Sequence, residues 1–159
     1  MYPYNTEMPI KKAGNENLFA QNSNNDEKLA ELMIMAIEEE ANDEQKYKAL
    51  AAAAVKEEDV EILRSIFLDE SRHKKLLGEI YEELYGVVPQ VKAKEYNFEG
   101  ADLAAQYNKN ILSEVEAARF YRDLANMFTD QEIINTIMSI LNDEQNHSVL
   151  NVYLFHNNH

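Results

Sequence analysis

The sequence of 159 residues contains no cysteine, four glycines and three prolines. Without cysteine, the chain cannot form a disulfide, a zinc ribbon, an iron–sulfur cluster or a thiol nucleophile. It has no uninterrupted apolar run near the roughly eighteen residues that a membrane span needs. The opening MYPYNTEMPIKKAGNEN also lacks the apolar core of a secretory signal. We therefore expect a cytoplasmic protein with no membrane partner.

Basic residues are also scarce. The sequence has 15 Lys and Arg residues against 29 Asp and Glu residues, which gives a net charge of −14. Because such a surface repels phosphate groups, we expect no nucleic-acid partner. An acidic surface can concentrate cations, although it also simply keeps a protein soluble.

Residues 1–24 differ from the rest of the chain. They hold two of the three prolines, are rich in asparagine and show no helical periodicity. We interpret them as an N-terminal arm, followed by one domain over residues 25–157. The only obvious anchors of the arm are Tyr2, Tyr4, Leu18 and Phe19.

The remainder is rich in strong helix formers, and no segment alternates long enough to suggest a strand. Breaks are expected at KEED (residues 56–59), in a linker over about residues 86–100, and at Thr129 or Asp130, one of which would cap the last helix. The four expected helices cover residues 26–55, 60–85, 101–128 and 131–155. The fold class is therefore all-α, a four-helix bundle. The linker is long enough to run the length of the bundle as a crossover between the second and third helices.

A shift of 74 positions superimposes one half of the sequence on the other. The repeated unit is E-x6-Y-x2-L-A followed by DExxH, which indicates a duplicated helical hairpin. The coinciding pairs are Glu40 and Glu114, Tyr47 and Tyr121, Leu50 and Leu124, Ala51 and Ala125, Asp69 and Asp143, Glu70 and Glu144, and His73 and His147.

The spacing within each hairpin has a geometric consequence. Glu40 and Glu70 are 30 residues apart and centred on residue 55, beside the expected turn, and the second half repeats this spacing. Residues equidistant from the turn of an antiparallel hairpin lie at one level, and side chains three apart project from one helix face. Each half therefore predicts two carboxylates and an imidazole at the same height of the bundle.

A single ExxH usually means two solvated residues, and a tyrosine at helical spacing is usually an ordinary core residue. The identical recurrence of all these residues within apolar stripes favours another interpretation. Four carboxylates in a core are costly unless cations neutralise them, and glutamate with histidine suits divalent transition metals. We therefore favour a two-metal site, with reuse of a duplicated scaffold without metal as the alternative.

The order Glu, ExxH, Glu, ExxH on four successive helices resembles the ferritin-like di-iron carboxylate superfamily. The E-x6-Y-x2-L-A motif resembles its rubrerythrin branch, and the resemblance covers about residues 26–157. It implies that Glu40 and His73 hold one ion as terminal ligands and that Glu114 and His147 hold the other. Glu70 and Glu144 would bridge the two ions. Tyr47 and Tyr121 would donate hydrogen bonds to ligand carboxylates.

Two departures from that family limit what the resemblance implies. Rubrerythrins proper append a rubredoxin domain with four cysteines, and this cysteine-free chain would need an external electron-donor protein. They also carry a further glutamate three residues after the third-helix ligand, where this sequence has Ala117. Asp43 occupies the equivalent place in the first half. It could be an extra ligand, or it could face solvent or a neighbouring helix.

The resemblance implies a di-iron oxidoreductase, of peroxidase or ferroxidase type, whose Fe(II) pair reacts with H2O2 or O2 in oxidative stress. Manganese could replace iron. The alternatives are a non-catalytic iron-binding or storage protein, a structural coat-type protein, and a dimanganese catalase. The wide apolar surface of LMIMAI (residues 32–37) predicts a homodimer, or extra core contact with the arm. We expect His156 and His159, in the tail, to face solvent.

Overall fold

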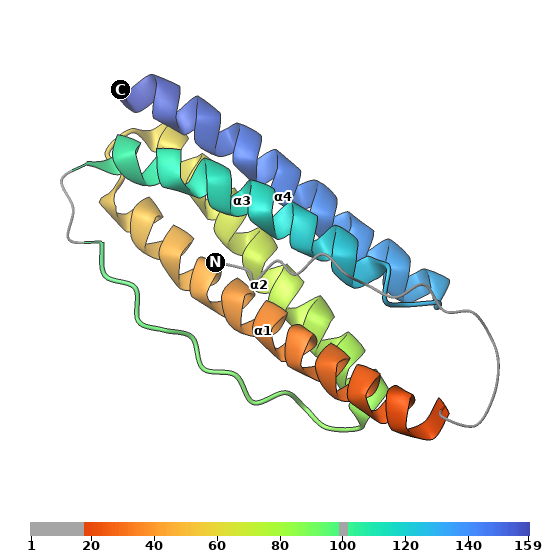
Figure 1. Cartoon of the computed structure of the whole chain (residues 1–159). Coiled ribbons are helices and arrows are strands. Elements are labelled where there is room, and N and C mark those ends of the chain that lie inside the picture. The colour runs from red at the N-terminus through yellow and green to blue at the C-terminus, as the bar shows by residue number, and fades with distance from the viewer. Residues whose placement is uncertain (1–17, 99–101) are drawn as a thin grey trace.

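The structure is a computed structural model that describes residues 18–98 and 102–159, with side chains from residue 26 onward. Its four helices are packed as a bundle, and these described residues contain no strand (Figure 1). The all-α four-helix fold expected from the sequence is thereby confirmed. The helices are α1 (Leu18–Ala53), α2 (Glu57–Tyr85), α3 (Leu103–Ala125) and α4 (Gln131–Asn158).

Helix α1 begins earlier than the sequence predicts. It starts at Leu18 rather than near residue 26, so the prediction of a non-helical arm is wrong for residues 18–24. This segment lacks proline and glycine, and extending an existing helix adds one hydrogen bond for each residue that is fixed. The remainder of the expected arm, with Tyr2 and Tyr4, lies outside the described residues, as do the side chains of Leu18 and Phe19.

The other helix ends also differ from expectation by a few residues. Most of the KEED segment belongs to α2, because three acidic residues in the first turn favour a helix N-terminus. Helix α2 ends at Tyr85 and is capped by Gly86, whose left-handed backbone (φ 70°) lets its N–H donate to the carbonyl of Glu82. Helix α3 starts after the N-cap Asp102 and ends at Ala125, short of residue 128.

The interior contains two apolar clusters. The first core cluster includes Ile37, Leu77, Ile137 and Ile140 among its buried members. The second core cluster consists of the buried residues Tyr47, Leu50, Leu63, Ile66, Tyr107 and Leu154. In α1, Glu40 falls between Ile37 of the first cluster and Tyr47 of the second, so buried polar residues occupy the level between the clusters.

The segment between α2 and α3 runs along the bundle (Figure 1). Near its start Val91 packs against the first core cluster, and near its end Phe98 packs against the second. Between them the backbone N–H of Lys94 donates to Asn42 Oδ1 of α1 at 2.8 Å. This is the long crossover that the linker length predicts. It starts α3 at the same end of the bundle as α2, where Tyr107 packs in one cluster with Tyr47 near the end of α1, so α3 runs antiparallel to α1 (Figure 1).

The LMIMAI segment of α1 (residues 32–37) is only partly buried in the core. Met33, Ala36 and Ile37 are buried, whereas Ile34 and Met35 are half-buried.

Within residues 18–98 and 102–159, no helix is long and apolar enough to cross a membrane.

The N-cap of α4 gives a direct test of the local structure. Asp130 Oδ1 accepts hydrogen bonds from the backbone N–H groups of Glu132 and Ile133, whereas Thr129 precedes the cap and is exposed. Asp130→Ala should therefore cost about 1 kcal/mol of unfolding free energy, which lowers the melting temperature by about 2–4 °C. Thr129→Ala is the matched control and should melt like the wild type. Equal losses in the two variants would contradict the assignment of the cap.

Candidate metal centre

All six predicted metal ligands lie in the interior, contributed by all four helices. In α2 the inward-facing residues Ile66, Glu70, His73, Leu77 and Ile80 follow each other at intervals of three and four, so the polar pair lies in the same stripe as the apolar core. Each of the six side chains belongs to a residue that is no more than 3 % exposed: Glu40, Glu70, His73, Glu114, Glu144 and His147.

The six side chains converge on one place. His73 Nδ1 lies 3.3 Å from Glu40 Oε2, 3.3 Å from Glu70 Oε2 and 3.0 Å from Glu144 Oε1. His147 Nδ1 lies 3.2 Å from Glu70 Oε1 and 3.6 Å from Glu144 Oε2. The ligand atoms form two groups, each compact enough to hold one ion, and Glu70 and Glu144 belong to both. The groups are Glu40, Glu70, His73 and Glu144, and Glu70, Glu114, Glu144 and His147.

Each of the six predicted ligands has one oxygen or nitrogen atom without a hydrogen-bond partner. Across the described residues, eight buried side-chain nitrogen or oxygen atoms have no partner, and six of them belong one each to the six predicted ligands. Buried polar atoms are nearly always paired, so a cluster of unpaired polar atoms needs a ligand to explain it. The six atoms are Glu40 Oε2, Glu70 Oε1, His73 Nδ1, Glu114 Oε2, Glu144 Oε1 and His147 Nδ1. The other two, Asp59 Oδ1 and Tyr107 Oη, lie elsewhere in the bundle.

Each repeated tyrosine reaches across to the other hairpin. The hydroxyl of Tyr47 in α1 donates to Glu114 Oε1 in α3, and that of Tyr121 in α3 donates to Glu40 Oε1 in α1. One oxygen of each glutamate is thus fixed by a tyrosine, while the other, Oε2, stays unpartnered.

The aspartates of the two DExxH motifs also act across the hairpins. His73 Nε2 lies 3.2 Å from Asp143 Oδ2, and His147 Nε2 lies 3.3 Å from Asp69 Oδ2. Arg72 links the two aspartates, with its Nη2 2.8 Å from Asp69 and 2.7 Å from Asp143. A carboxylate on Nε2 leaves the Nδ1 lone pair directed at the cluster, which is the arrangement that metal-binding histidines need. The aspartates are part of the repeated motif, but sequence spacing gave no sign of this crosswise pairing.

Two further residues near the cluster were missed by the sequence analysis. Lys46, only 8 % exposed, has its Nζ 3.7 Å from Glu114 Oε1 and 2.7 Å from Asp43 Oδ1. Asn151, fully buried in α4, donates to the hydroxyl of Tyr47 at 2.8 Å. Asp43 belongs to neither group of metal-ligating atoms, and its carboxylate is committed to Lys46 instead.

The comparison with known families agrees with this geometry. The family model described as Rubrerythrin matches residues 31–150, which is most of the chain and includes all six predicted ligands. The chain belongs to the rubrerythrin family. No curated protein and no solved structure matches it. For a member of this family, a buried cluster of four glutamates and two histidines is a candidate di-iron site.

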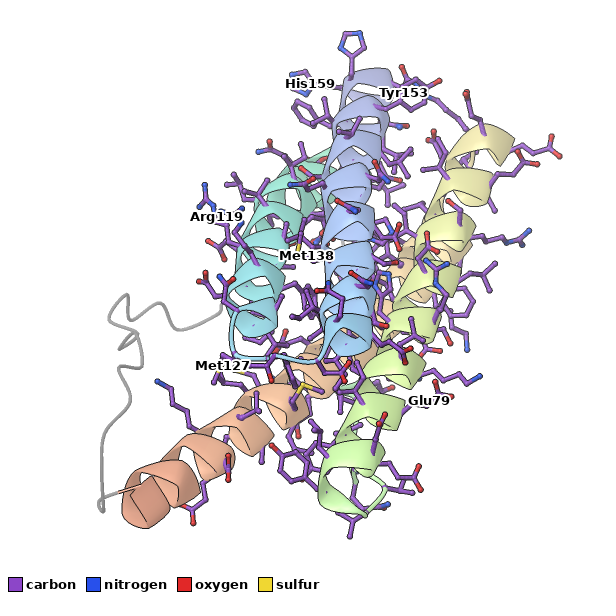
Figure 2. All side chains as sticks on the ribbon, turned by 90° about the vertical axis from the view of Figure 1, so that its right-hand side faces the viewer. Glu79, Arg119, Met127, Met138, Tyr153 and His159 are labelled. Atoms are coloured by element: carbon purple, nitrogen blue, oxygen red, sulfur yellow. The ribbon has the colours of Figure 1, made fainter. Side chains whose placement is uncertain are left out.

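The tail histidines stand apart from this rubrerythrin-type centre. His156 and His159 are exposed, and His159 lies at the C-terminal tip of the bundle, beyond the end of α4 (Figure 2). Its ring contacts that of Phe155, with the centroids 5.0 Å apart.

Burial and mutual repulsion set the protonation of the centre in the absence of metal. Burial raises the pKa of Glu40 and of Glu114. Burial alone would also raise the pKa of Glu70, but the imidazoles of His147 and His73 hold it below its usual range. Burial disfavours a charged His147, yet the carboxylates of Asp69, Glu144 and Glu70 raise its pKa to about 12. The pKa of His73 is raised in the same way, by Glu144, Glu40 and Glu70 against its burial.

Metal binding should therefore release protons. Because the pKa of each imidazole is raised, we expect both to carry a proton at pH 7, which each must lose to offer Nδ1 to an ion. We expect about two or more protons released per chain on loading with two divalent ions, and an affinity that falls as the pH is lowered. Calorimetric titration in buffers of different ionisation enthalpy measures this release. His156→Ala should leave the count unchanged. Binding without proton release would show that the imidazoles are neutral in the metal-free protein.

Proposed function

We propose that this protein is a di-iron oxidoreductase in which an Fe(II) pair is oxidised by H2O2 or O2. The observation that carries the proposal is the set of six orphaned donor atoms, one on each of the six residues that the duplicated motif selects. Their chemistry fits the group. Carboxylate oxygens and imidazole nitrogens, with no thiolate, suit iron or manganese rather than copper(I) or zinc–thiolate sites.

The positions of the residues suggest which would be terminal ligands and which would bridge the two ions. Glu40 with His73, and Glu114 with His147, would be the terminal ligands of the two ions. Glu70 and Glu144 would bridge them, since only these two belong to both groups of donor atoms. Tyr47 and Tyr121 hold one oxygen of each terminal glutamate, and Asp69 and Asp143 fix the tautomer of each histidine.

When bound, an Fe(II) pair supplies one electron from each ion, and with two protons these reduce H2O2 to two water molecules. The protein's part is to hold the ions in a dry interior and to keep their ligands oriented. A further cycle requires two electrons from outside the centre. The sequence has no cysteine to hold an electron-transfer iron, so we propose an external donor protein.

We also propose that the chain forms a homodimer through α1 and α2. Ile34 and Met35 of α1 line a surface hollow together with Tyr81 of α2, which gives the two helices a shared apolar face. Sedimentation velocity should then give twice the 18.4 kDa mass of one chain. A monomer would overturn the dimer, and a much larger assembly would favour the storage or coat-type alternatives.

Removing a bridging ligand should cost both ions. In Glu70→Ala or Glu144→Ala, bound iron should fall from about two ions per chain to well below one, because each carboxylate serves both positions. Glu40→Ala removes a terminal ligand and should retain about one ion. Metal analysis after anaerobic loading and desalting measures the content. Glu79→Ala is the control, since Glu79 points outward from α2 and pairs only at the surface with Lys75 (Figure 2). Two ions retained in Glu70→Ala would refute the bridging role.

The reaction itself is tested by mixing the Fe(II)-loaded protein anaerobically with H2O2 or O2 in a stopped-flow spectrophotometer. We expect near-ultraviolet absorbance of Fe(III) to rise at least about tenfold faster than for free Fe(II), faster with H2O2 than with O2, and again after re-reduction. Oxidation no faster than that of free Fe(II) would contradict the proposal and favour a storage or structural protein. Oxygen release from H2O2 by the Mn(II)-loaded protein alone would favour a dimanganese catalase.

A further inference from the structure

The two halves of the metal centre are not equivalent. Around Tyr47 and Glu114 lie five polar residues, each of which has an apolar counterpart 74 positions away in the sequence. The polar residues are Asp43, Lys46, Gln106, Asn110 and Asn151. Their counterparts are, in the same order, Ala117, Phe120, Leu32, Ala36 and Leu77, and all five belong to the first core cluster or pack against it, together with Tyr121.

The strongest difference is a buried cation on one side. Lys46 Nζ lies 3.7 Å from Glu114 Oε1 and 4.7 Å from the centre of the Tyr47 ring. The equivalent place in the second hairpin is taken by Phe120, whose ring packs edge-on against Tyr121 with centroids 5.4 Å apart. Glu114 therefore faces a positive charge, whereas the place equivalent to that charge beside Glu40 holds a hydrocarbon ring.

A chain of amides fixes the same side. Gln106 Nε2 donates to Asn110 Oδ1 at 2.9 Å, and Asn110 Nδ2 donates to Asn151 Oδ1 at 3.1 Å. Asn151 Nδ2 then donates to the Tyr47 hydroxyl, whose own proton is left to bond Glu114 Oε1. Glu114 Oε1 thus accepts a hydrogen bond from Tyr47 and is also attracted by the charge of Lys46.

We propose that Lys46 makes the two metal positions unequal. The position served by Glu114 and His147 (the Glu114 position) binds a divalent ion more weakly, and fills later, than the position served by Glu40 and His73 (the Glu40 position). The lysine repels an incoming cation and competes with it for Glu114. Asp43, 2.7 Å from Lys46, offsets part of that repulsion. This inference rests on the proposed two-metal centre.

The test is an anaerobic Co(II) titration, followed by visible absorbance and by calorimetry. The wild type should bind two ions in separate steps whose affinities differ about tenfold or more, or 1.4 kcal/mol. His147→Ala disables the Glu114 position and should keep the tighter step, while His73→Ala should keep the weaker one. Two equal steps would overturn the inference and leave the metal centre standing. Absence of Co(II) binding would overturn both.

Substitutions of the ion pair should move the weaker step in opposite directions. In the His73→Ala background, Lys46→Met should tighten Co(II) binding about tenfold, and Asp43→Asn should weaken it by a similar factor, because it leaves the lysine uncompensated. Lys46→Arg, which keeps the charge, should bind like the parent. In the His147→Ala background the same changes should have less than about a third of these effects, because no lysine or arginine of residues 26–98 and 102–159 acts on Glu40 as Lys46 acts on Glu114.

Lys48→Met is the matched control, since Lys48 is an exposed lysine two residues away on α1. It should change neither step. If Lys46 only supports the structure, Lys46→Met and Asp43→Asn should both weaken Co(II) binding, and should do so at both metal positions. That result would refute the proposal. If Lys46→Met does not fold, Asp43→Asn at a half-buried position still decides the question, because only a charge effect predicts weaker binding confined to the Glu114 position.

Discussion

The structure depends on one constraint, the burial of four carboxylates and two imidazoles between the two apolar clusters of a helical bundle. Each of these charges would cost several kcal/mol if it were buried without a partner, and several kinds of contact reduce this cost. The two imidazoles lie against the carboxylates, the tyrosines donate to Glu40 and Glu114, the aspartates contact Nε2 of each histidine, and six atoms remain without a hydrogen-bond partner. The crossover and the helix caps that the structure describes help to hold four helix faces at this one level.

The supporting contacts are consistently crosswise. Tyr47 of the first hairpin holds Glu114 of the second, and Tyr121 holds Glu40 in return. Asp69 and Asp143 exchange partners in the same way with His147 and His73, and Arg72 ties the two aspartates together. Neither hairpin can therefore complete its own ligands, although each carries a full motif. The repeat accounts for this pattern, because two copies of one hairpin that pack against each other make each contact twice, once in each direction.

The sequence predicted the fold and all six converging side chains because their signals are periodic and repeated. Spacings of three, four, 30 and 74 residues survive in the sequence, whatever the side-chain conformations are. Lys46 and Asn151 were missed for the opposite reason. Neither is repeated in the other half, where Phe120 and Leu77 take their places. In an acidic helical sequence a lysine is also normally a solvated residue. The crosswise partners of the aspartates depend on how the hairpins dock, which spacing alone does not encode. The start of α1 at Leu18 was missed because asparagine-rich segments have low helix propensity, and here helix extension outweighs it.

The two halves of the metal centre differ in the residues around the ligands, and the unrepeated polar residues lie on the side of Glu114. Ala117, buried in the first core cluster, stands where the resemblance would place an additional carboxylate, and its counterpart Asp43 is bound to Lys46. Neither half thus offers a free fifth carboxylate that could serve as a seventh ligand. For Asp43 to become a ligand, it would have to leave a buried ammonium group unpaired, at a cost comparable to breaking a buried ion pair. If Lys46 weakens one metal position as we propose, the same residue also keeps the nearest spare carboxylate away from both. A single unrepeated residue would then set how many ligands the centre offers and how evenly two ions are held.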